Sequence, residues 1–358
     1  MTKVLTVIGT RPQFIKAAAV SRAINEHGSI KEILLHTGQH YDDVMSDIFF
    51  REMHIPKPDY HFSINTSTHA TMTAQMLEGI EQAIIKEKPD KILVYGDTNS
   101  TLAGALAASK LHMPVSHVEA GLRSFNMDMP EEVNRILTDR VSTQLFCPTE
   151  AAMQNLQNEG LATADKTVVN TGDVMYDAAL YYAQQASQRS SILQQLGVSP
   201  DKYLLVTVHR AENTDDKERL TKIVNAINTL AKQYTIVLPL HPRTKKMIEQ
   251  YHLSLDCMVI NPVGYIDMLS LLQNCHLVLT DSGGLQKEAY FFHKYCITLR
   301  DQTEWVELTK AGCSTITGAD EAKILQAVAD MYDKQFKNGS IFYGDGYAAG
   351  IIAKHLAT

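Results

Sequence analysis

Short runs rich in Val, Ile and Leu recur along the first half of the chain, and a longer stretch with helical spacing follows each run. The short runs predict buried strands, and the longer stretches, such as 68–87 and 100–112, predict helices. The predicted strands of this half cover 3–9, 32–38, 91–97, 114–121, 144–150 and 167–173. Strands that alternate with helices are typical of a doubly wound parallel sheet.

The second half restarts the same pattern, with predicted strands over 202–209, 235–241, 257–262, 276–284 and 295–301. The fold class is therefore α/β, with two Rossmann-like domains over 1–172 and 173–345 that join near 170–182. A chain of 358 residues is longer than one compact core usually takes. Polar and small residues collect directly after the strands, at the edge where open parallel sheets bind ligands. We expect the two domains to face one another across a cleft.

The composition narrows the class of partner. A formal net charge of −7 argues against broad nucleic-acid binding. The five cysteines are scattered and never spaced C-x-x-C, which favours reduced core thiols over a disulfide frame or a zinc site. No apolar run reaches the length of a membrane span or has the form of a signal peptide. We expect a cytoplasmic protein.

The stretch "IGTRPQFIK" (8–16) places two cations after the first predicted strand. Gly9 permits a tight turn, and Arg11 and Lys16 then stand at or near a helix N-terminus, where they suit a phosphate. A solvated helix start is the alternative interpretation. The stretch is not a G-x-G-x-x-G fingerprint, so it implies no nicotinamide cofactor.

Carboxylates follow two neighbouring strands of the first half. Asp97 in "YGDTNSTLAG" and Glu119 in "HVEAGLRS" each end a strand, and one sheet edge would bring them together. Either one alone could be a helix cap or a turn residue. Glu131 lies in the first turn of a helix that opens with proline, where acidic residues are common for electrostatic reasons. Arg135, one turn further on, could orient Glu131 through an ion pair.

The second half carries basic pairs at the ends of two strands. His209 and Arg210 follow one strand in "VTVHRAEN", and His241 and Arg243 follow the next in "LPLHPRT". Both pairs of basic side chains could bind phosphate oxygens, although a single histidine is more often structural. The fourteen histidines never fall in H-E-x-x-H or a similar spacing, so we predict no metal.

The stretch "TDSGGLQKEA" (280–289) joins a predicted strand to a predicted helix. Ser282, Gly283 and Gly284 offer a hydroxyl and unshielded N–H groups at the helix N-terminus, which suits an anion. Glu288 could accept hydrogen bonds from the hydroxyls of a ribose. A glycine packing turn is the alternative, and the absence of a Walker A pattern argues against ATP hydrolysis.

Taken together and in order, these stretches resemble the non-hydrolysing UDP-N-acetylglucosamine 2-epimerase family. The matching stretches are "GTRP", "GDTNST", "HVEAGLRS", "PEE", "HR", "HPR" and "TDSGG", and they cover almost the whole chain. The resemblance implies the GT-B fold and a C-terminal helix, here 346–358, that returns to the first domain. It also implies a UDP-sugar substrate, no cofactor and a homodimer.

The resemblance further implies roles for residues. The catalytic residues would be Asp97, Glu119, Glu131 and His209. The substrate-binding residues would be Arg11, Lys16, Arg135, Arg210, His241, Met268, Ser282, Gly283, Gly284 and Glu288. The implied chemistry starts with cleavage of the C1–O bond, because the C2 proton of an N-acetylhexosamine is not acidic by itself. A carboxylate then removes that proton, a second acid returns one on the opposite face, and UDP adds back.

Several positions depart from the family pattern. Gln13 and Phe14 replace "EA" after "GTRP", Lys287 replaces a glutamate, and Trp305 replaces an arginine. The region of an activating second UDP-sugar in many members reads "QHYDDVM" (39–45) here, which puts such activation in doubt. The variants favour the branch acting on UDP-2,3-diacetamido-2,3-dideoxyglucuronate, with UDP-GlcNAc as the other substrate. A GT-B glycosyltransferase and a non-catalytic UDP-sugar binder remain the alternative classes.

Overall fold

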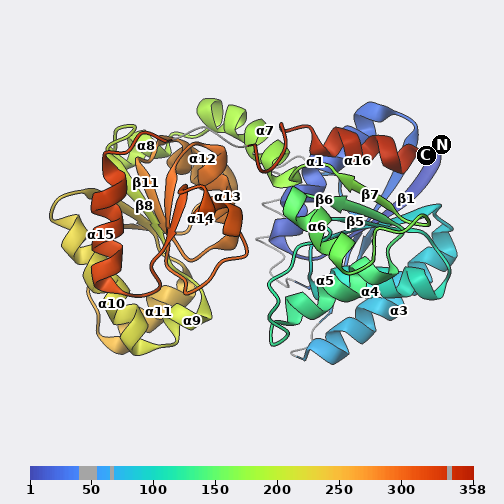
Figure 1. Cartoon of the computed structure of the whole chain (residues 1–358), viewed down its shortest axis with the longest axis horizontal. Coiled ribbons are helices and arrows are strands. Elements are labelled where there is room, and N and C mark those ends of the chain that lie inside the picture. Colours follow the sequence, from blue (N-terminus) through green and yellow to red (C-terminus); the bar gives the residue numbers. More distant parts are fainter. Residues whose placement is uncertain (40–54, 65–67, 337–340) are drawn as a thin grey trace. The chain divides into compact units, whose positions relative to one another are not determined.

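The computed structural model describes residues 1–39, 55–64, 68–336 and 341–358, with the side chain of Arg11 outside that description. The chain forms two compact units, Met1–Leu180 with Ile341–Thr358, and Tyr181–Ser340. Each unit is built around its own parallel sheet (Figure 1).

The first unit holds a seven-stranded sheet in the order β3-β2-β1-β4-β5-β6-β7. Its strands are β1 Thr2–Ile8, β2 Ile30–His36, β3 Tyr60–His61, β4 Lys91–Tyr95, β5 Val115–Val118, β6 Gln144–Cys147 and β7 Thr167–Asn170. Its helices include α1 Arg11–His27, α3 His69–Glu87, α4 Asn99–Lys110, α5 Pro130–Val141 and α6 Glu150–Asn158. The side chains of Leu5, Val7 and Val94 on the sheet pack in one cluster with Met76 and Ala103 on the helices, which removes a large apolar area from water.

The second unit holds a six-stranded parallel sheet in the order β10-β9-β8-β11-β12-β13. Its strands are β8 Tyr203–Thr207, β9 Thr235–Pro239, β10 Met258–Ile260, β11 Leu277–Thr280, β12 Tyr295–Thr298 and β13 Ser314–Ile316. Its helices include α8 Ile192–Leu196, α9 Ala211–Thr214, α10 Lys217–Ala231, α11 Pro242–Tyr251, α12 Tyr265–Asn274, α13 Gly283–Phe291, α14 Val306–Lys310 and α15 Glu321–Tyr332. Numbered within the unit, the strand order is 3-2-1-4-5-6, the Rossmann order.

The predicted α/β class and both sheets are confirmed. Two strands are additional, β3 with two residues and β13 with three, because "YH" and "STI" together contain a single Val, Ile or Leu residue. Several predicted strands extend past their true ends: the one over 91–97 stops at Tyr95, and the one over 114–121 stops at Val118. The surplus residues form the turns at the carboxyl edge of the sheet, which is where the candidate site lies.

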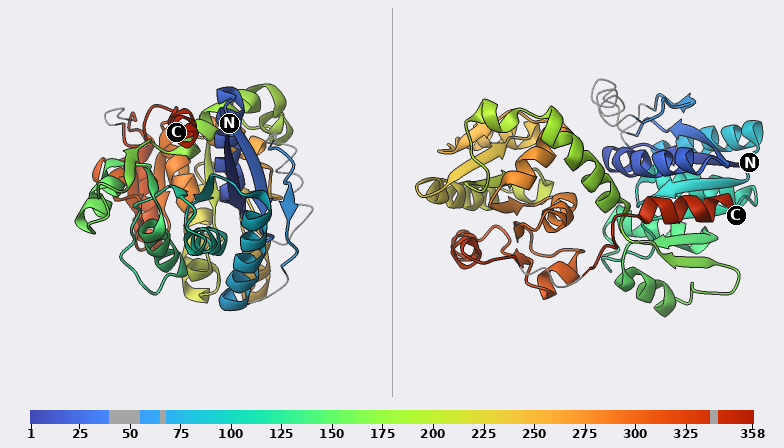
Figure 2. Two further views of the ribbon diagram at one scale, coloured as in Figure 1. Left: turned by 90° about the vertical axis from the view of Figure 1, so that its right-hand side faces the viewer. Right: turned by 90° about the horizontal axis from the view of Figure 1, so that it is seen from above.

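The C-terminal helix α16, Ala348–Ala357, packs along α1 in the first unit, as Figures 1 and 2 show. The two chain ends therefore lie side by side, and the hydroxyl of Thr2 donates to the carbonyl of Ala357 at 3.2 Å. Helix α7, Val174–Arg189, caps α16, because the Asp177 carboxylate accepts the amides of Ala348 at 3.1 Å and Ala349 at 2.7 Å.

The segment that follows β7 and leads to the second unit contacts the segment that returns from it before α16, and this contact lies inside the first unit. The amide of Asp173 donates to the carbonyl of Tyr343 at 2.9 Å. A β-carbon on Gly172 would lie 2.8 Å from that carbonyl oxygen and 3.0 Å from the α-carbon of Gly344. Only glycine permits this approach, so the two segments are held at one point.

Candidate active site

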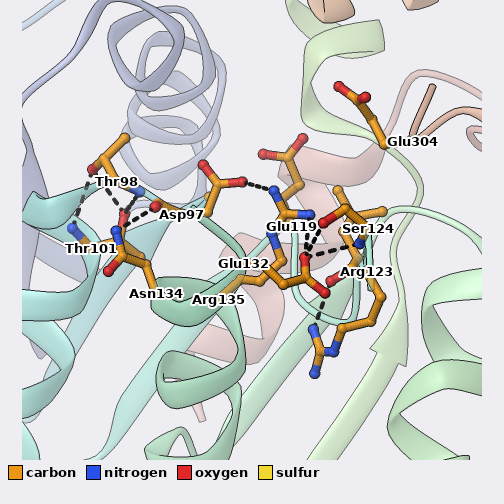
Figure 3. A network of polar contacts seen from close by, with 12 residues as sticks. Asp97, Thr98, Thr101, Glu119, Arg123, Ser124, Glu132, Asn134, Arg135 and Glu304 are labelled. Atoms are coloured by element: carbon orange, nitrogen blue, oxygen red, sulfur yellow. Dashed lines mark hydrogen bonds and ion pairs between the residues drawn. The ribbon is translucent and has the colours of Figure 1, made fainter. Parts of the chain in front are cut away.

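A turn after β4 carries Asp97, and side chains from α1, α5 and β5 hold this turn. The side-chain amide of Gln13 donates to the carbonyl of Tyr95 at 2.8 Å and to the hydroxyl of Thr98 at 3.0 Å. Asn134 donates to the carbonyl of Asp97 at 2.9 Å, and Nε2 of His117 donates to that of Gly96 at 2.7 Å; Figure 3 shows part of this network. The backbone on both sides of Asp97 is therefore fixed.

Gln13 also fixes the loop after β1. Its side-chain oxygen accepts the amides of Gly9 at 2.7 Å and Thr10 at 3.1 Å, and the side chain is buried. One residue thus ties the "GTRP" loop to the Asp97 turn. The sequence marked Gln13 only as a departure from the family pattern.

The Asp97 carboxylate contacts the guanidinium of Arg135 at 2.5 Å. Burial raises the pKa of Asp97 above its ordinary value, Arg135 opposes the rise, Glu119 adds to it and Lys16 opposes it. A carboxyl group with a raised pKa and a partly exposed side chain is suited to proton transfer.

Glu119 follows β5 and has a backbone φ of 72°, in the left-handed region that non-glycine residues rarely occupy. Its carboxylate forms an ion pair with Lys16, and both side chains are nearly buried. The neighbouring Gly96 leaves room for them, since a β-carbon there would lie 3.2 Å from Oε2 of Glu119. Strain of this kind is typical of functional sites.

The predicted ion pair between Arg135 and Glu131 is wrong. Arg135 is bonded instead to Asp97 and, at 3.1 Å, to Glu132 (Figure 3). Glu131 lies exposed in the first turn of α5, while Glu132 is fully buried. Successive helical residues point in directions about 100° apart, so the two glutamates face opposite surroundings.

A second buried network supports the same strand ends. Nδ1 of His117 contacts Asp139 at 2.7 Å, and Arg123 contacts the other carboxylate oxygen of Asp139 at 2.7 Å. Although burial raises the pKa of Asp139, His117 and Arg123 hold it below the ordinary value. Arg123 also forms two hydrogen bonds to Glu159, at 2.6 and 2.8 Å. The arginine of "HVEAGLRS" therefore has a structural role.

In the second unit, Ser282 caps α13, and its hydroxyl accepts the amide of Leu285 at 3.4 Å. Gly283 and Gly284 form the first turn, where amides have no acceptor within the helix. A β-carbon on Gly283 would lie 2.5 Å from Glu304 Oε1 and 3.7 Å from Arg210 Nη2. The predicted glycine turn at a helix N-terminus is thus present, with Arg210 next to it.

His209 and Arg210 follow β8 and are held by Asp281, a buried residue that sequence reasoning missed. The Asp281 carboxylate accepts the amides of His209 and Arg210, each at 3.0 Å, and lies 3.4 Å from Nδ1 of His209. His209 itself is 39% exposed, so its ring is accessible. The "TD" before "SGG" is the sequence signal for this role.

His241 caps α11, where its Nδ1 accepts the amide of Arg243 at 3.2 Å. The ring centroids of His241 and His209 lie 5.7 Å apart, so the two predicted histidines are neighbours. Arg243 forms an ion pair with Asp215.

Glu288 lies on α13, buried, and accepts the hydroxyl of Tyr265 at 2.8 Å. Burial raises the pKa of Tyr265 well above its ordinary value, and Glu288 adds to the rise. Tyr265 thus orients the carboxylate predicted to bind the ribose. Met268, one turn along α12, is partly buried against an apolar cluster of this unit.

Two departures from the family pattern are buried side chains. Phe14 lies against His36, with ring centroids 5.0 Å apart. The indole of Trp305 donates to the carbonyl of Gly283 at 2.9 Å, and the ammonium of Lys287 lies 4.2 Å from its ring centroid. Trp305 therefore braces the glycine turn.

Some predictions fall outside the described residues, namely the side chain of Arg11 and residues 40–45 of the stretch 39–45. Within the described ranges, no group of three or more His, Cys, Asp or Glu side chains could hold a metal ion. In the same ranges, no helix has the length and apolar character needed to span a membrane.

The two Rossmann-like units, with a glycine turn at α13 in one and strand-end carboxylates in the other, define an enzyme of the GT-B class. Residues 22–357 match the family described as UDP-N-acetylglucosamine 2-epimerase. The chain is 55% identical, over 99% of both chains, to UDP-2,3-diacetamido-2,3-dideoxy-D-glucuronate 2-epimerase of Pseudomonas aeruginosa.

Solved structures similar to the chain are also UDP-GlcNAc 2-epimerases. The UDP-GlcNAc 2-epimerase of Methanocaldococcus jannaschii, in complex with UDP-GlcNAc and UDP, is 41% identical with a TM-score of 0.89, over 99% of both chains. The Neisseria meningitidis UDP-GlcNAc 2-epimerase bound to UDP-GlcNAc is 33% identical with a TM-score of 0.88, also over 99% of both chains. The chain belongs to the UDP-N-acetylglucosamine 2-epimerase family and is an isomerase, as its motifs predicted.

Proposed function

We propose that this protein inverts C2 of UDP-2,3-diacetamido-2,3-dideoxyglucuronate, for bacterial surface polysaccharide precursors. The observation that carries the choice of substrate is the identity of 55% over 99% of both chains to the Pseudomonas aeruginosa enzyme. The relatives that act on UDP-GlcNAc share less, for example 42% and 33% identity. UDP-GlcNAc is the second substrate to test.

The proposed reaction begins when the C1–O bond breaks and its electron pair leaves with UDP. The proton on C2 is then labile, and a carboxylate removes it to give a 2-acetamidoglucal-type intermediate. A second carboxylic acid returns a proton to the opposite face, and UDP adds back to C1. The reaction is an isomerisation, so it uses no redox partner.

We assign the proton transfers to Asp97, Glu119 and Glu131. Asp97 and Glu119 follow neighbouring strands, and the raised pKa of Asp97 suits a group that gives and takes protons. Arg135 and Lys16 lie against these two carboxylates and would bind substrate together with Arg11.

We assign UDP to the second unit. Ser282, Gly283 and Gly284 would bind the diphosphate through the helix N-terminus, with Arg210, His209 and His241 beside it. Glu288 would accept the ribose hydroxyls, and Met268 completes the proposed binding residues. His209 would also stabilise the departing UDP.

Incubation with each UDP-sugar in D2O tests the proposal. NMR should show deuterium at C2 and a manno-configured product. Retention of the C2 proton with both UDP-sugars would refute the epimerase assignment, and sugar transfer to an acceptor would indicate a glycosyltransferase. Glu119→Gln should bind UDP but lose the exchange. Unchanged exchange would remove Glu119 from the mechanism.

We further propose that the enzyme acts in the cytoplasm as a homodimer, which the family resemblance implies. Light scattering coupled to size-exclusion chromatography measures the mass in solution. A monomer mass at working concentrations would contradict the dimer.

A further inference from the structure

We propose that Glu132 is a positioning residue that holds Arg135 between two carboxylates and so sets the proton affinity of Asp97. The proposal rests on the proposed function, in which Asp97 transfers a proton. It assigns a role to the second glutamate of "PEE", next to the predicted catalytic Glu131.

Glu132 is a fully buried carboxylate with four donors. It accepts the amide and hydroxyl of Ser124 and the amide of Phe125, each at 2.9 Å. Arg135 supplies the fourth contact, from Nη1 at 3.1 Å. A buried carboxylate with this many donors is fully paired and fixes the groups around it.

The turn that Glu132 holds has an unfavourable backbone conformation. Phe125 has a φ of 57°, in the left-handed region that bulky side chains avoid, and its side chain is 78% exposed. The hydrogen bonds that Ser124 and Phe125 donate to Glu132 offset that strain. Glu132 therefore fixes the segment that leads into α5 and to Glu131.

Arg135 shares its charge between two carboxylates. Nη1 contacts Glu132, while Nη2 contacts Asp97, and the guanidinium is nearly buried (Figure 3). Without the charge of Glu132, Arg135 would pair with Asp97 alone and would favour its ionised form. Glu132 thus weakens the hold of Arg135 on Asp97 while keeping the guanidinium in place.

The other charged groups that face Asp97 act from different elements. Glu119 after β5 raises the pKa of Asp97, Lys16 on α1 lowers it, and burial is the largest cause of the rise. His117 on β5 reaches the same turn through the carbonyl of Gly96. None of these contacts includes Glu132, so a change at Glu132 tests its own effect.

The test is a titration of Asp97 by carbon-13 NMR in the full chain, with Asp97→Asn used for assignment. Glu132→Gln should lower the midpoint of Asp97 by about one pH unit. Arg135→Gln, which leaves the turn contacts of Glu132 in place, should raise the midpoint of Asp97 and move the carboxyl carbon signal of Glu132 at a fixed pH. The Asp97 midpoint should therefore shift in opposite directions in the two variants. Opposite shifts distinguish a shared guanidinium from a general loss of order.

Asp128→Asn is the matched control, since it removes one exposed negative charge four residues away, in the loop before α5. It should leave the Asp97 midpoint unchanged. If Glu132→Gln does not fold, Arg135→Gln alone decides: an unchanged midpoint of Asp97 or an unmoved carboxyl carbon signal of Glu132 would refute the shared guanidinium. An unchanged or raised Asp97 midpoint in a folded Glu132→Gln would do the same.

Kinetics give a second readout. The acid limb of the pH profile of kcat/KM should move to lower pH in Glu132→Gln. At the optimum, kcat should be reduced and KM nearly unchanged. A uniform loss of activity with an unshifted limb would leave Glu132 with a purely structural role and overturn the proposal. The titration needs no turnover, so it tests Glu132 even if no UDP-sugar is epimerised.

Discussion

The indole N–H of Trp305 donates to the carbonyl of Gly283 at 2.9 Å, which links the loop before α14 to the first residue of α13. The same ring lies under the ammonium of Lys287 at 4.2 Å. The hydrogen bond thus holds the carbonyl of Gly283 in place. It thereby fixes the direction of the backbone amides in the glycine turn. This contact predicts an effect on UDP binding.

Trp305→Phe keeps a ring beneath Lys287 but removes the hydrogen bond to Gly283. One neutral hydrogen bond contributes about 1 kcal/mol, so the Kd for UDP should rise roughly fivefold. Isothermal titration calorimetry measures the change. An unchanged Kd would show that the turn is fixed without the indole N–H.

Tyr265→Phe removes the donor to the buried Glu288 carboxylate. We expect UDP affinity to fall roughly tenfold, because a hydrogen bond to a charged group contributes about 1.5 kcal/mol. The 2′,3′-dideoxy analogue of UDP is the control ligand, since it lacks the hydroxyls that Glu288 would accept. Equal losses for both ligands would mean that Glu288 does not bind the ribose.

Gly96→Ala tests the space beside Glu119. Gly96 has a φ of 62°, and a β-carbon there would lie 3.2 Å from Oε2 of Glu119 and 3.6 Å from Nζ of Lys16. We expect a loss of about 1 kcal/mol in the free energy of unfolding and at least a tenfold loss in kcat. Gly28→Ala is the matched control, because Gly28 has a φ of 74° with no atom within 4 Å of its β-carbon. It should lose similar stability and keep its activity.

Asp177 predicts a pH dependence of stability. Burial raises its pKa to about 6, although the amides of Ala349 and Ala348 oppose the rise. The folded state therefore binds more protons than the unfolded state between about pH 4 and 6. The contribution to stability is complete below about pH 4 and is lost as the pH rises through 6, by at most about 3 kcal/mol.

Urea unfolding of the wild type and of Asp177→Asn, at several pH values, measures this contribution. The difference in free energy of unfolding, wild type minus variant, should shrink as the pH rises from 4 to 7. Other acidic groups are present in both proteins and cancel. A difference that grows with pH would contradict the raised pKa.

The sequence predicted the strand-end residues of the site well, because position after a strand depends only on local pattern. Asp97, Glu119, His209 and Gly283 all lie at carboxyl edges, as expected. The sequence could not decide whether Glu131 or Glu132 pairs with Arg135. Arg135 is four residues from one and three from the other, and both spacings allow an ion pair.

Residues that act through others also escaped prediction. Gln13 and Asp281 are buried polar side chains whose partners lie on other strands and loops. Their bonding follows from the way β4 lies beside β1 and β11 beside β8. Tyr265 and Trp305 likewise become meaningful only once α12 and the loop before α14 lie against α13.

The contact between Asp173 and Tyr343 has a consequence for protein engineering. The segments that lead out of the first unit and back into it meet at a glycine-lined point inside that unit, so residues 181–340 form a removable cassette. Replacing the cassette with a short loop should leave one continuous Rossmann-like protein. That protein would retain Asp97, Glu119 and Arg135 and would let the folding of this half be studied by itself.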